Sequence, residues 1–237
     1  MKLVFVDECG DTKFKNYLGI CVAIIDSISY GKIKNGFQGI LRESKWDETI
    51  EFKGSHLFSA TSGDTKVDVS ARVNIAEKIL DLNKAAKNAR MYFYYARQDN
   101  VKDQRVAYLA SLPSFLQKIL PRPQKGRGKN ILTLSCDYRD DIKPQEIHRI
   151  AEPVIKKKGY ILFENVTMPK SCFHTVGILF ADIVGYLAAR LDVISKDVQL
   201  FENIPEGELQ NKGKVKKLVS SSRLLKKIKN MELYEKK

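Results

Sequence analysis

Two acidic residues follow stretches of apolar residues in the same way. The segment LVFVD places Asp7 after four apolar residues, and the segment ILTLSCD places Asp137 after a similar run. Such runs predict buried strands, and parallel strands of an α/β sheet present the residues that follow them at one edge. We therefore expect these two carboxylates to lie together, although either aspartate alone would also suit a turn.

A third acidic residue, Asp182, lies within the segment GILFADIVGYLAA, which has the length of a helix and is apolar on nearly every face. Burying an unpaired carboxylate costs several kcal/mol, so we expect a cation beside it. Arg190 follows eight residues later, which is too far to be a neighbour on the same helix. The partner is then either a basic residue elsewhere in the chain or a bound metal ion.

The segment EFKGSHLF adds Glu51 and Lys53, which point to the same side if the segment is extended. A carboxylate beside an ammonium group suits phosphate chemistry, although exposed pairs of this kind are also common. Carboxylate oxygens favour Mg²⁺ or Mn²⁺ as the bound ion. Because Cys9, Cys136 and Cys172 fall near the aspartates in the sequence, a zinc site with thiolate ligands is the alternative.

The elements that must position these residues alternate between strand and helix patterns. The segments KLVFVD and YLGICVAIID predict a hairpin, and NILTLSCD predicts a strand that is buried on both faces. Further strands are expected at ARMYFYYAR and GYILFENVTM, and helices over 30–43, 65–88, 101–119, from Pro144 onward, and over 174–191. This order predicts an α/β fold, with a mixed sheet flanked by helices. We expect one domain over residues 1–205 and a partly helical basic tail over residues 206–237.

Positive charge predicts a polyanionic partner. The 237-residue chain carries 41 Lys and Arg against 28 Asp and Glu, a net charge of +13. Much of the excess lies in the tail, and a second basic run lies in a Pro- and Gly-rich loop. Such patches favour nucleic acid as the partner, with an ordinary solvated surface as the alternative. The candidate nucleic-acid-binding residues are Lys125, Arg127, Lys129, Lys214, Lys216 and Lys217.

Several other classes of protein are not supported by the sequence. The longest apolar stretch, Val176 to Leu191, is short for a bilayer span and contains two charged residues. We expect no signal peptide, and the four widely spaced cysteines fit reduced thiols, so we expect a cytoplasmic protein. The chain has no phosphate-binding loop of the type G-x-x-x-x-G-K-[ST], which leaves nucleotide hydrolysis without support.

Four segments together resemble one family. FVDECGD, EFKGSHLF, CDYRDD and SCFHTVGILFADIVGYLAARL resemble the motifs of the DUF3800 proteins over residues 4 to about 191. The family usually opens with Asp-Glu-Ser-Gly, where this chain has Cys9 for the serine, and it usually has glutamine where this chain has Leu179. Both departures spare the acidic residues. The family is similar in fold to the RNase H-like superfamily, so the resemblance implies an RNase H-like mixed sheet.

The resemblance also implies an activity, the hydrolysis of phosphodiester bonds at a two-metal site. It implies that the four acidic ligands are Asp7, Glu51, Asp137 and Asp182. Asp7 would bridge two Mg²⁺ or Mn²⁺ ions, and Lys53 would offset charge on the phosphate.

Two further residues and one rival function complete the predictions. Ser171 and His174 stand before the last helix, where they would begin the helix or contact the substrate. The rival is a nucleic-acid-binding module without catalysis, which uses the basic tail and loop. Binding by such a module would fall with salt and would not require Mg²⁺.

Overall fold

The computed structural model describes residues 1–11, 17–57, 66–85, 91–123, 126 and 130–196. Five strands and six helices are found in these ranges. They are β1 (Lys2–Asp11), β2 (Tyr17–Asp26), α1 (Ser27–Glu43), α2 (Gly54–Leu57), α3 (Val69–Ala85), β3 (Met91–Gln98), α4 (Gln104–Ile119), β4 (Ile131–Cys136), α5 (Pro144–Lys157), β5 (Ile161–Leu162) and α6 (Val176–Lys196). Within these ranges, no helix combines the length and the apolar character needed to cross a membrane.

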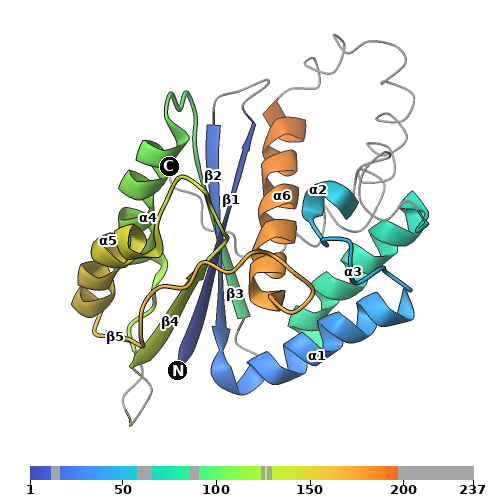
Figure 1. Cartoon of the computed structure of the whole chain (residues 1–237), viewed down its shortest axis with the longest axis horizontal. Coiled ribbons are helices and arrows are strands. Elements are labelled where there is room, and N and C mark those ends of the chain that lie inside the picture. The colour runs from blue at the N-terminus through green and yellow to red at the C-terminus, as the bar shows by residue number, and fades with distance from the viewer. Residues whose placement is uncertain (12–16, 58–65, 86–90, 124–125, 127–129, 197–237) are drawn as a thin grey trace.

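The strands form one mixed sheet in the order β3-β2-β1-β4-β5. β1 and β2 form the antiparallel hairpin that the sequence predicts, and β3 pairs antiparallel with β2. β4 runs parallel to β1, and β5 runs parallel to β4. Helices cover both faces of the sheet (Figure 1). The predicted α/β class, a mixed sheet flanked by helices, is therefore confirmed.

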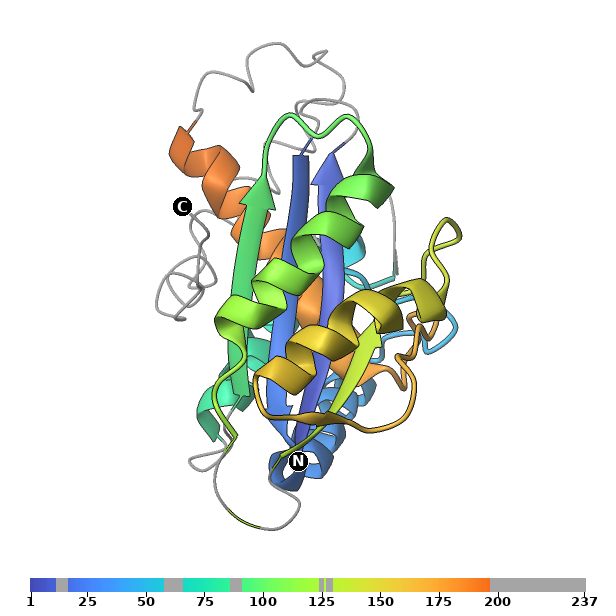
Figure 2. The ribbon, with the colours of Figure 1, turned by 90° about the vertical axis from the view of Figure 1, so that its left-hand side faces the viewer.

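The two helical layers enclose separate hydrophobic cores. α4 and α5 lie together over one face of the sheet (Figure 2), where they pack on residues of β1 and β4 that include Val4 and Leu132. α1, α3 and α6 cover the other face, where their core includes Phe37, Ile79 and Phe180. α6 lies directly on β1 and β2. Most of its described side chains are buried, as expected for a helix that is apolar on nearly every face.

The structure corrects three strand predictions. Asp7 does not end its strand, because pairing with β2 continues to Asp11 opposite Tyr17. β4 is not buried on both faces, since its side chains alternate between buried and half-buried along the strand. The strand predicted over GYILFENVTM shrinks to Ile161–Leu162, because Glu164 has a left-handed backbone (φ 59°) that breaks the pairing with β4.

Helix α5 shows how the local sequence fixes an element. Pro144 occupies its first turn, where a proline is tolerated because the backbone N–H has no partner within the helix. The Glu146 side chain accepts a hydrogen bond from the backbone N–H of Lys143 (3.0 Å), which caps the start of the helix. The segment between β4 and α5, residues 137–143, is thereby held between two fixed ends, and it begins with Asp137.

Candidate functional site

Asp7 lies on the face of β1 that is covered by α6. Its neighbours at alternate positions, Phe5 and Cys9, pack in the core beneath that helix, and side chains two residues apart in a strand share a face. The Asp7 side chain is 6% exposed. Its Oδ1 accepts a hydrogen bond from the backbone N–H of Glu8 (2.9 Å), and no ion pair joins Asp7 to any described residue. A buried acid therefore lies in the middle of the sheet without a basic partner among the described residues.

Asp137 lies next to Asp7 across the parallel pair of strands. Val6 pairs with Cys136 in the register of β1 and β4, and the backbone N–H of Asp137 donates to the carbonyl oxygen of Val6 (2.8 Å). The Ser171 hydroxyl donates to Oδ1 of Asp137 (2.6 Å). This bond holds the half-buried carboxylate by one of its two oxygens.

Asp182 reaches the same region from α6, and two glycines allow the close approach. A Cβ atom at Gly177 would lie 2.4 Å from the ring of Phe5 in β1, and one at Gly185 would lie 2.9 Å from Cβ of Cys21 in β2. Both distances are shorter than real Cβ contacts, so a larger residue would push the helix off the sheet. Asp182 lies between these glycines in the sequence.

The Asp182 carboxylate is held by the short helix α2. The backbone N–H of Gly54 donates to Oδ2 of Asp182 (2.6 Å). This approach also requires a glycine, because a Cβ at Gly54 would lie 2.7 Å from Cβ of Tyr186. No ion pair joins Asp182 to another residue in the described ranges. The salt bridge that the sequence left open as its explanation is therefore not found there.

Glu51 and Lys53 pair with each other just before α2. Lys53 Nζ lies 3.2 Å from Oε1 of Glu51, and both side chains are half-buried. Burial lowers the pKa of Lys53, but the ion pair with Glu51 and the charges of Asp137 and Asp182 outweigh this effect and leave the pKa raised. The Lys53 charge in turn lowers the pKa of Asp182. The predicted pair is thus near enough to the aspartates to act on their charge.

Burial, and after it the charges of neighbouring acids, raises the pKa values of Asp7 and Asp182. Burial raises the pKa of Asp7 well above its usual range, and the charges of Asp182, Glu8 and Asp137 raise it further. Burial also raises the pKa of Asp182 to about 6, against the opposing effects of the Gly54 hydrogen bond and the Lys53 charge. The interaction between Asp7 and Asp182 shows that these two carboxylates, far apart in sequence, share one electrostatic environment.

The donor chemistry of the three aspartates, which we call the carboxylate centre (Asp7, Asp137 and Asp182), fits a hard divalent cation. Each carboxylate has one oxygen held by the protein, through Glu8, Ser171 or Gly54, and one without a hydrogen bond to a described residue. Oxygen ligands and local negative charge are what Mg²⁺ and Mn²⁺ require. In their present positions, however, no three His, Cys, Asp or Glu side chains of the described ranges are arranged to hold a metal ion.

The zinc alternative receives no support from the cysteines. Cys9 is half-buried and its thiol donates to the carbonyl oxygen of Gly185 (3.6 Å). Burial raises the pKa of Cys9 well above its usual range and raises that of Cys136 to about 12. Burial therefore opposes formation of the thiolates that zinc binds. Cys172 is exposed and lies outside these two environments.

The two residues predicted before the last helix have different positions. Ser171 contacts Asp137, as described above, so the structure joins it to the carboxylate centre. His174 instead lies beside Gln38 of α1, with its Nδ1 3.3 Å from Nε2 of that side chain. Its ring also packs against Phe173. His174 thus belongs to the junction between α1 and the segment before α6.

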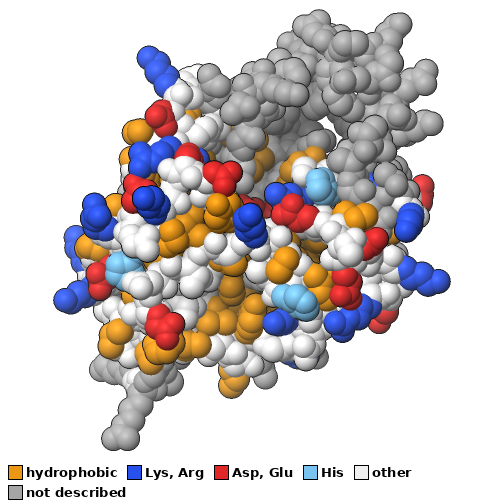
Figure 3. Space-filling view, viewed as in Figure 1, with side chains coloured by type: hydrophobic (Ala, Val, Ile, Leu, Met, Phe, Trp, Pro, Cys, Tyr) orange, Lys and Arg blue, Asp and Glu red, His pale blue; other side chains and the backbone are white. Residues whose placement is uncertain are grey.

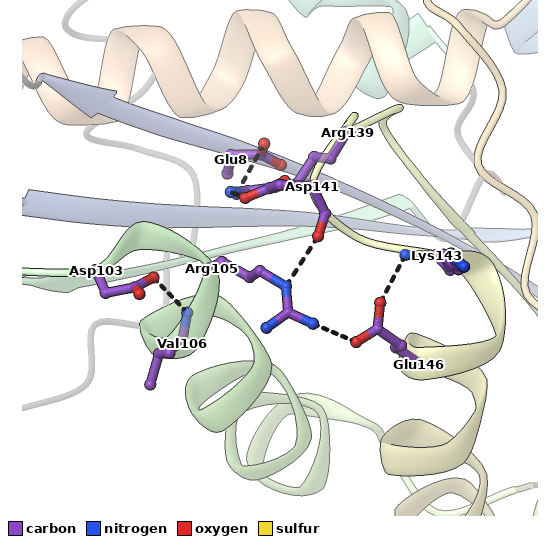
Figure 4. A network of polar contacts seen from close by, with 8 residues as sticks. All are labelled: Glu8, Asp103, Arg105, Val106, Arg139, Asp141, Lys143 and Glu146. Carbon is purple, nitrogen blue, oxygen red and sulfur yellow. Dashed lines mark hydrogen bonds and ion pairs between the residues drawn. The ribbon is translucent and has the colours of Figure 1, made fainter.

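A separate polar network lies on the opposite face of the sheet (Figure 4). Arg139 Nη1 donates to Oε1 of Glu8 (3.1 Å), and the same guanidinium pairs with Asp141 (2.8 Å). Arg105 of α4 pairs with Glu146 of α5, and its Nε donates to the carbonyl oxygen of Asp141 (2.8 Å). We call these five residues the ion-pair network. It fixes the segment that begins with Asp137 to the two helices on that face.

The sequence missed most of these supporting contacts. The pair between Glu8 and Arg139 was not predicted, although the alternation of a strand places the side chains of Asp7 and Glu8 on opposite faces. No local pattern marks Gly54 as the donor to Asp182, because the two residues are 128 positions apart.

The predicted nucleic-acid-binding residues cannot be placed. Those residues, all outside the described ranges, are Lys125, Arg127, Lys129, Lys214, Lys216 and Lys217.

Comparison with known proteins finds similarity in structure only. No protein-family model matches the chain, and no curated protein matches it in sequence. It is similar to the ribonuclease H2 from Pyrococcus horikoshii OT3, with 13% identity, a TM-score of 0.49, and coverage of 94% of this chain and 100% of that one. It is also similar to the RNase HII in the PCNA:RNase HII complex from Archaeoglobus fulgidus, with 13% identity, a TM-score of 0.42, and coverage of 93% and 88%. Similarity at this level assigns no activity and no residue role to this chain.

Proposed function

We propose that this chain is a metal-dependent nuclease of the RNase H-like type, which hydrolyses phosphodiester bonds in nucleic acid at the carboxylate centre. One observation carries the proposal. Asp7 is buried in the sheet, the charges of two other aspartates raise its pKa, and no basic residue of the described ranges pairs with it. Holding such a group ionised is costly unless a cation is bound, so a divalent metal ion is the natural partner.

The proposed roles follow from where the residues lie. When bound, two Mg²⁺ or Mn²⁺ ions would provide a nucleophilic water and would stabilise charge on the phosphodiester oxygens. Asp7 would contribute to both metal positions, and Asp137 and Asp182 would complete the ligands. Ser171 and Gly54 orient these two carboxylates by holding one oxygen of each. This fixed orientation lowers the reorganisation needed when the ligands bind.

Glu51 and Lys53 have roles that depend on their pairing. Glu51 would provide a further ligand or orient the water, and the ammonium group of Lys53 would offset negative charge on the scissile phosphate. Because Lys53 pairs with Glu51, a ligand held by Glu51 would compete with Lys53 for that carboxylate. The four free cysteines agree with the reducing cytoplasm as the compartment in which the protein acts.

The direct test is a cleavage assay with single- and double-stranded DNA and RNA, in Mg²⁺, in Mn²⁺ and in EDTA. We expect cleavage that requires one of the metals. A crystal soaked in Mn²⁺ should show one or two anomalous peaks among Asp7, Asp137, Asp182 and Glu51. The absence of both metal-dependent cleavage and anomalous peaks would contradict the proposal.

One observation favours the rival, a non-catalytic nucleic-acid-binding module. No three potential ligands of the described ranges are arranged to hold a metal ion in the present side-chain positions. For the rival, binding should fall with salt and should not change with Mg²⁺. Deleting residues 206–237 should reduce the slope of log K against log salt, because each phosphate contact adds roughly 0.9 to that slope on duplex DNA. Metal-dependent cleavage would decide against the rival.

A further inference from the structure

A pocket of about 460 Å³ lies between the ends of α4 and α5, away from the carboxylate centre. Its lining consists of Gln117, Arg122, Pro123, Lys157 and Lys158. Three of these five residues are cationic and none is acidic. β4 separates the two sites, since the pocket lies beside the start of that strand and Asp137 follows its end. Six residues of strand correspond to about 20 Å.

Local backbone geometry gives the pocket its shape. Gly159 follows α5 with a φ of 90°, a left-handed conformation that other residues rarely adopt. Its open α-carbon faces Pro123, because a Cβ there would lie 3.3 Å from Cγ of the proline. The next residue but one, Ile161, donates its N–H to the carbonyl oxygen of Asn130 (2.7 Å). These contacts hold the segment after α5 against the segment after α4, so Arg122 and Lys158 line the same hollow.

No described acidic residue pairs with the cations of the pocket. In the part of the chain that the structure describes, Arg122, Lys157 and Lys158 make no ion pair. Lysines at the end of a helix ordinarily complement its dipole, and two helices end here. Each helix end, however, carries only about half a negative charge, so the two together offset roughly one of the three cations. Several Lys and Arg side chains project from the side of the molecule that carries α4 and α5 (Figure 3).

We infer that this pocket binds a phosphate group of a nucleic-acid backbone, as an anchoring site separate from the carboxylate centre. Arg122 offers a planar fork that matches two phosphate oxygens, and Lys157 and Lys158 act as point charges. None of the five described lining residues is aromatic, so they offer a base no ring on which to stack. Contacts to phosphate alone position a nucleic acid without reading its sequence. The site needs no metal, so it stands apart from the proposed hydrolysis.

The test measures binding of a fluorescein-labelled 20-base-pair DNA duplex to the full chain in EDTA, over a range of salt concentrations. The double variant Arg122→Gln/Lys157→Gln removes two charges from the pocket. The matched control Lys32→Gln/Lys78→Gln removes two charges from exposed positions on α1 and α3, in the other helical layer. Melting curves of both variants check that the fold is intact, and Lys158→Gln alone serves if the double variant melts early.

We expect the pocket variant to bind the duplex roughly tenfold more weakly than the control, with a slope of log K against log salt that is smaller by about two. The assay contains no metal, so it reports binding without cleavage: a chain whose duplex binding depends on the pocket but which never cleaves would contradict the nuclease proposal alone. Equal affinities and slopes for the pocket and control variants would overturn the inference. The inference is also overturned if inorganic phosphate at millimolar concentration competes with the duplex for the wild type while the pocket variant keeps full affinity for the duplex.

Discussion

Asp7 and Glu8 are adjacent in β1, but the two faces of the sheet give them opposite electrostatic surroundings. On the face of α4 and α5, Glu8 belongs to the ion-pair network, in which acidic and basic groups alternate from Glu8 through Arg139 and Asp141. On the face of α6, Asp7 has acidic neighbours and no described basic partner. Burial raises the pKa of Glu8 to about 7 even though Arg139 opposes the shift, and it raises the pKa of Asp7 well above its usual range.

This difference separates two uses of buried charge. The ion-pair network satisfies most of its own hydrogen bonds and ties four segments together, namely β1, residues 137–143, α4 and α5, which is what a structural network does. The carboxylate centre concentrates like charge that the described residues do not neutralise, which destabilises the metal-free protein and favours a cation. We therefore expect adjacent residues of one strand to have separable effects on activity and on stability, and variants at each can test this.

The largest effect should come from the pair of variants Asp7→Asn and Glu8→Gln. Both remove one negative charge from β1 and preserve the shape of the side chain. We expect Asp7→Asn to reduce metal-dependent cleavage by about 1000-fold or more, equivalent to roughly 4 kcal/mol in the barrier. Glu8→Gln should change the rate by less than about tenfold. Initial rates at saturating Mg²⁺ and Mn²⁺ provide the measurement, and equal losses in both variants would contradict the division between the two faces.

Removing the central cation of the network should mainly affect stability. Arg139→Met leaves Glu8 and Asp141 without their partner, and it removes the contact with the Tyr108 ring, 5.2 Å away. We expect the free energy of unfolding in urea to fall by about 3 kcal/mol, because a buried carboxylate loses its counter-ion. Adding Glu8→Gln should restore part of the loss. Glu48→Gln, in an exposed pair with Arg42, should cost less than about 1 kcal/mol. If Arg139→Met costs as little as Glu48→Gln, the pair between Glu8 and Arg139 contributes little to stability.

Metal binding should stabilise the wild type through the carboxylate centre alone. At a hundredfold excess over the dissociation constant, Mg²⁺ or Mn²⁺ should add about 2.7 kcal/mol to the free energy of unfolding. Asp182→Asn should lose most of this gain, and without metal it should be as stable as the wild type or more stable, since one of several crowded charges is gone. Asp141→Asn, an equivalent change in the network, should keep the metal effect. Strong destabilisation of metal-free Asp182→Asn would show that Asp182 forms a salt bridge instead.

The smallest effect is the pH dependence of stability without metal. Asp182 and Glu8 have folded-state pKa values of about 6 and about 7, above their values in the unfolded chain. The folded protein therefore binds more protons than the unfolded chain between about pH 4 and pH 7, so stability falls as the pH rises through this range. We expect Asp182→Asn to make the fall in stability between about pH 4 and pH 6 smaller than in the wild type. Urea titrations at several pH values in EDTA measure it, and unchanged curves would contradict the shift.

The sequence predicts which aspartates come together better than it predicts the groups that hold them. An apolar strand and an apolar helix mark Asp137 and Asp182 locally, and the parallel pairing of β1 with β4 brings Asp137 beside Asp7. The position of Asp7 within its strand was missed, because the length of β1 depends on the register with β2. Ser171 and Gly54 were not predicted as positioning groups, since their hydrogen bonds join segments far apart in the chain.

α6 contacts the sheet closely at Gly177 and Gly185, so the spacing within the carboxylate centre depends on the size of these two residues. A methyl group at either position would have to move Phe5 or Cys21, or lift the helix. In the second case the separation between Asp7 and Asp182 would change while every ionisable group stayed the same. Substitutions at these two positions therefore offer a variable that charge-removing variants lack, because they alter the spacing of the acids and leave their number and identity constant.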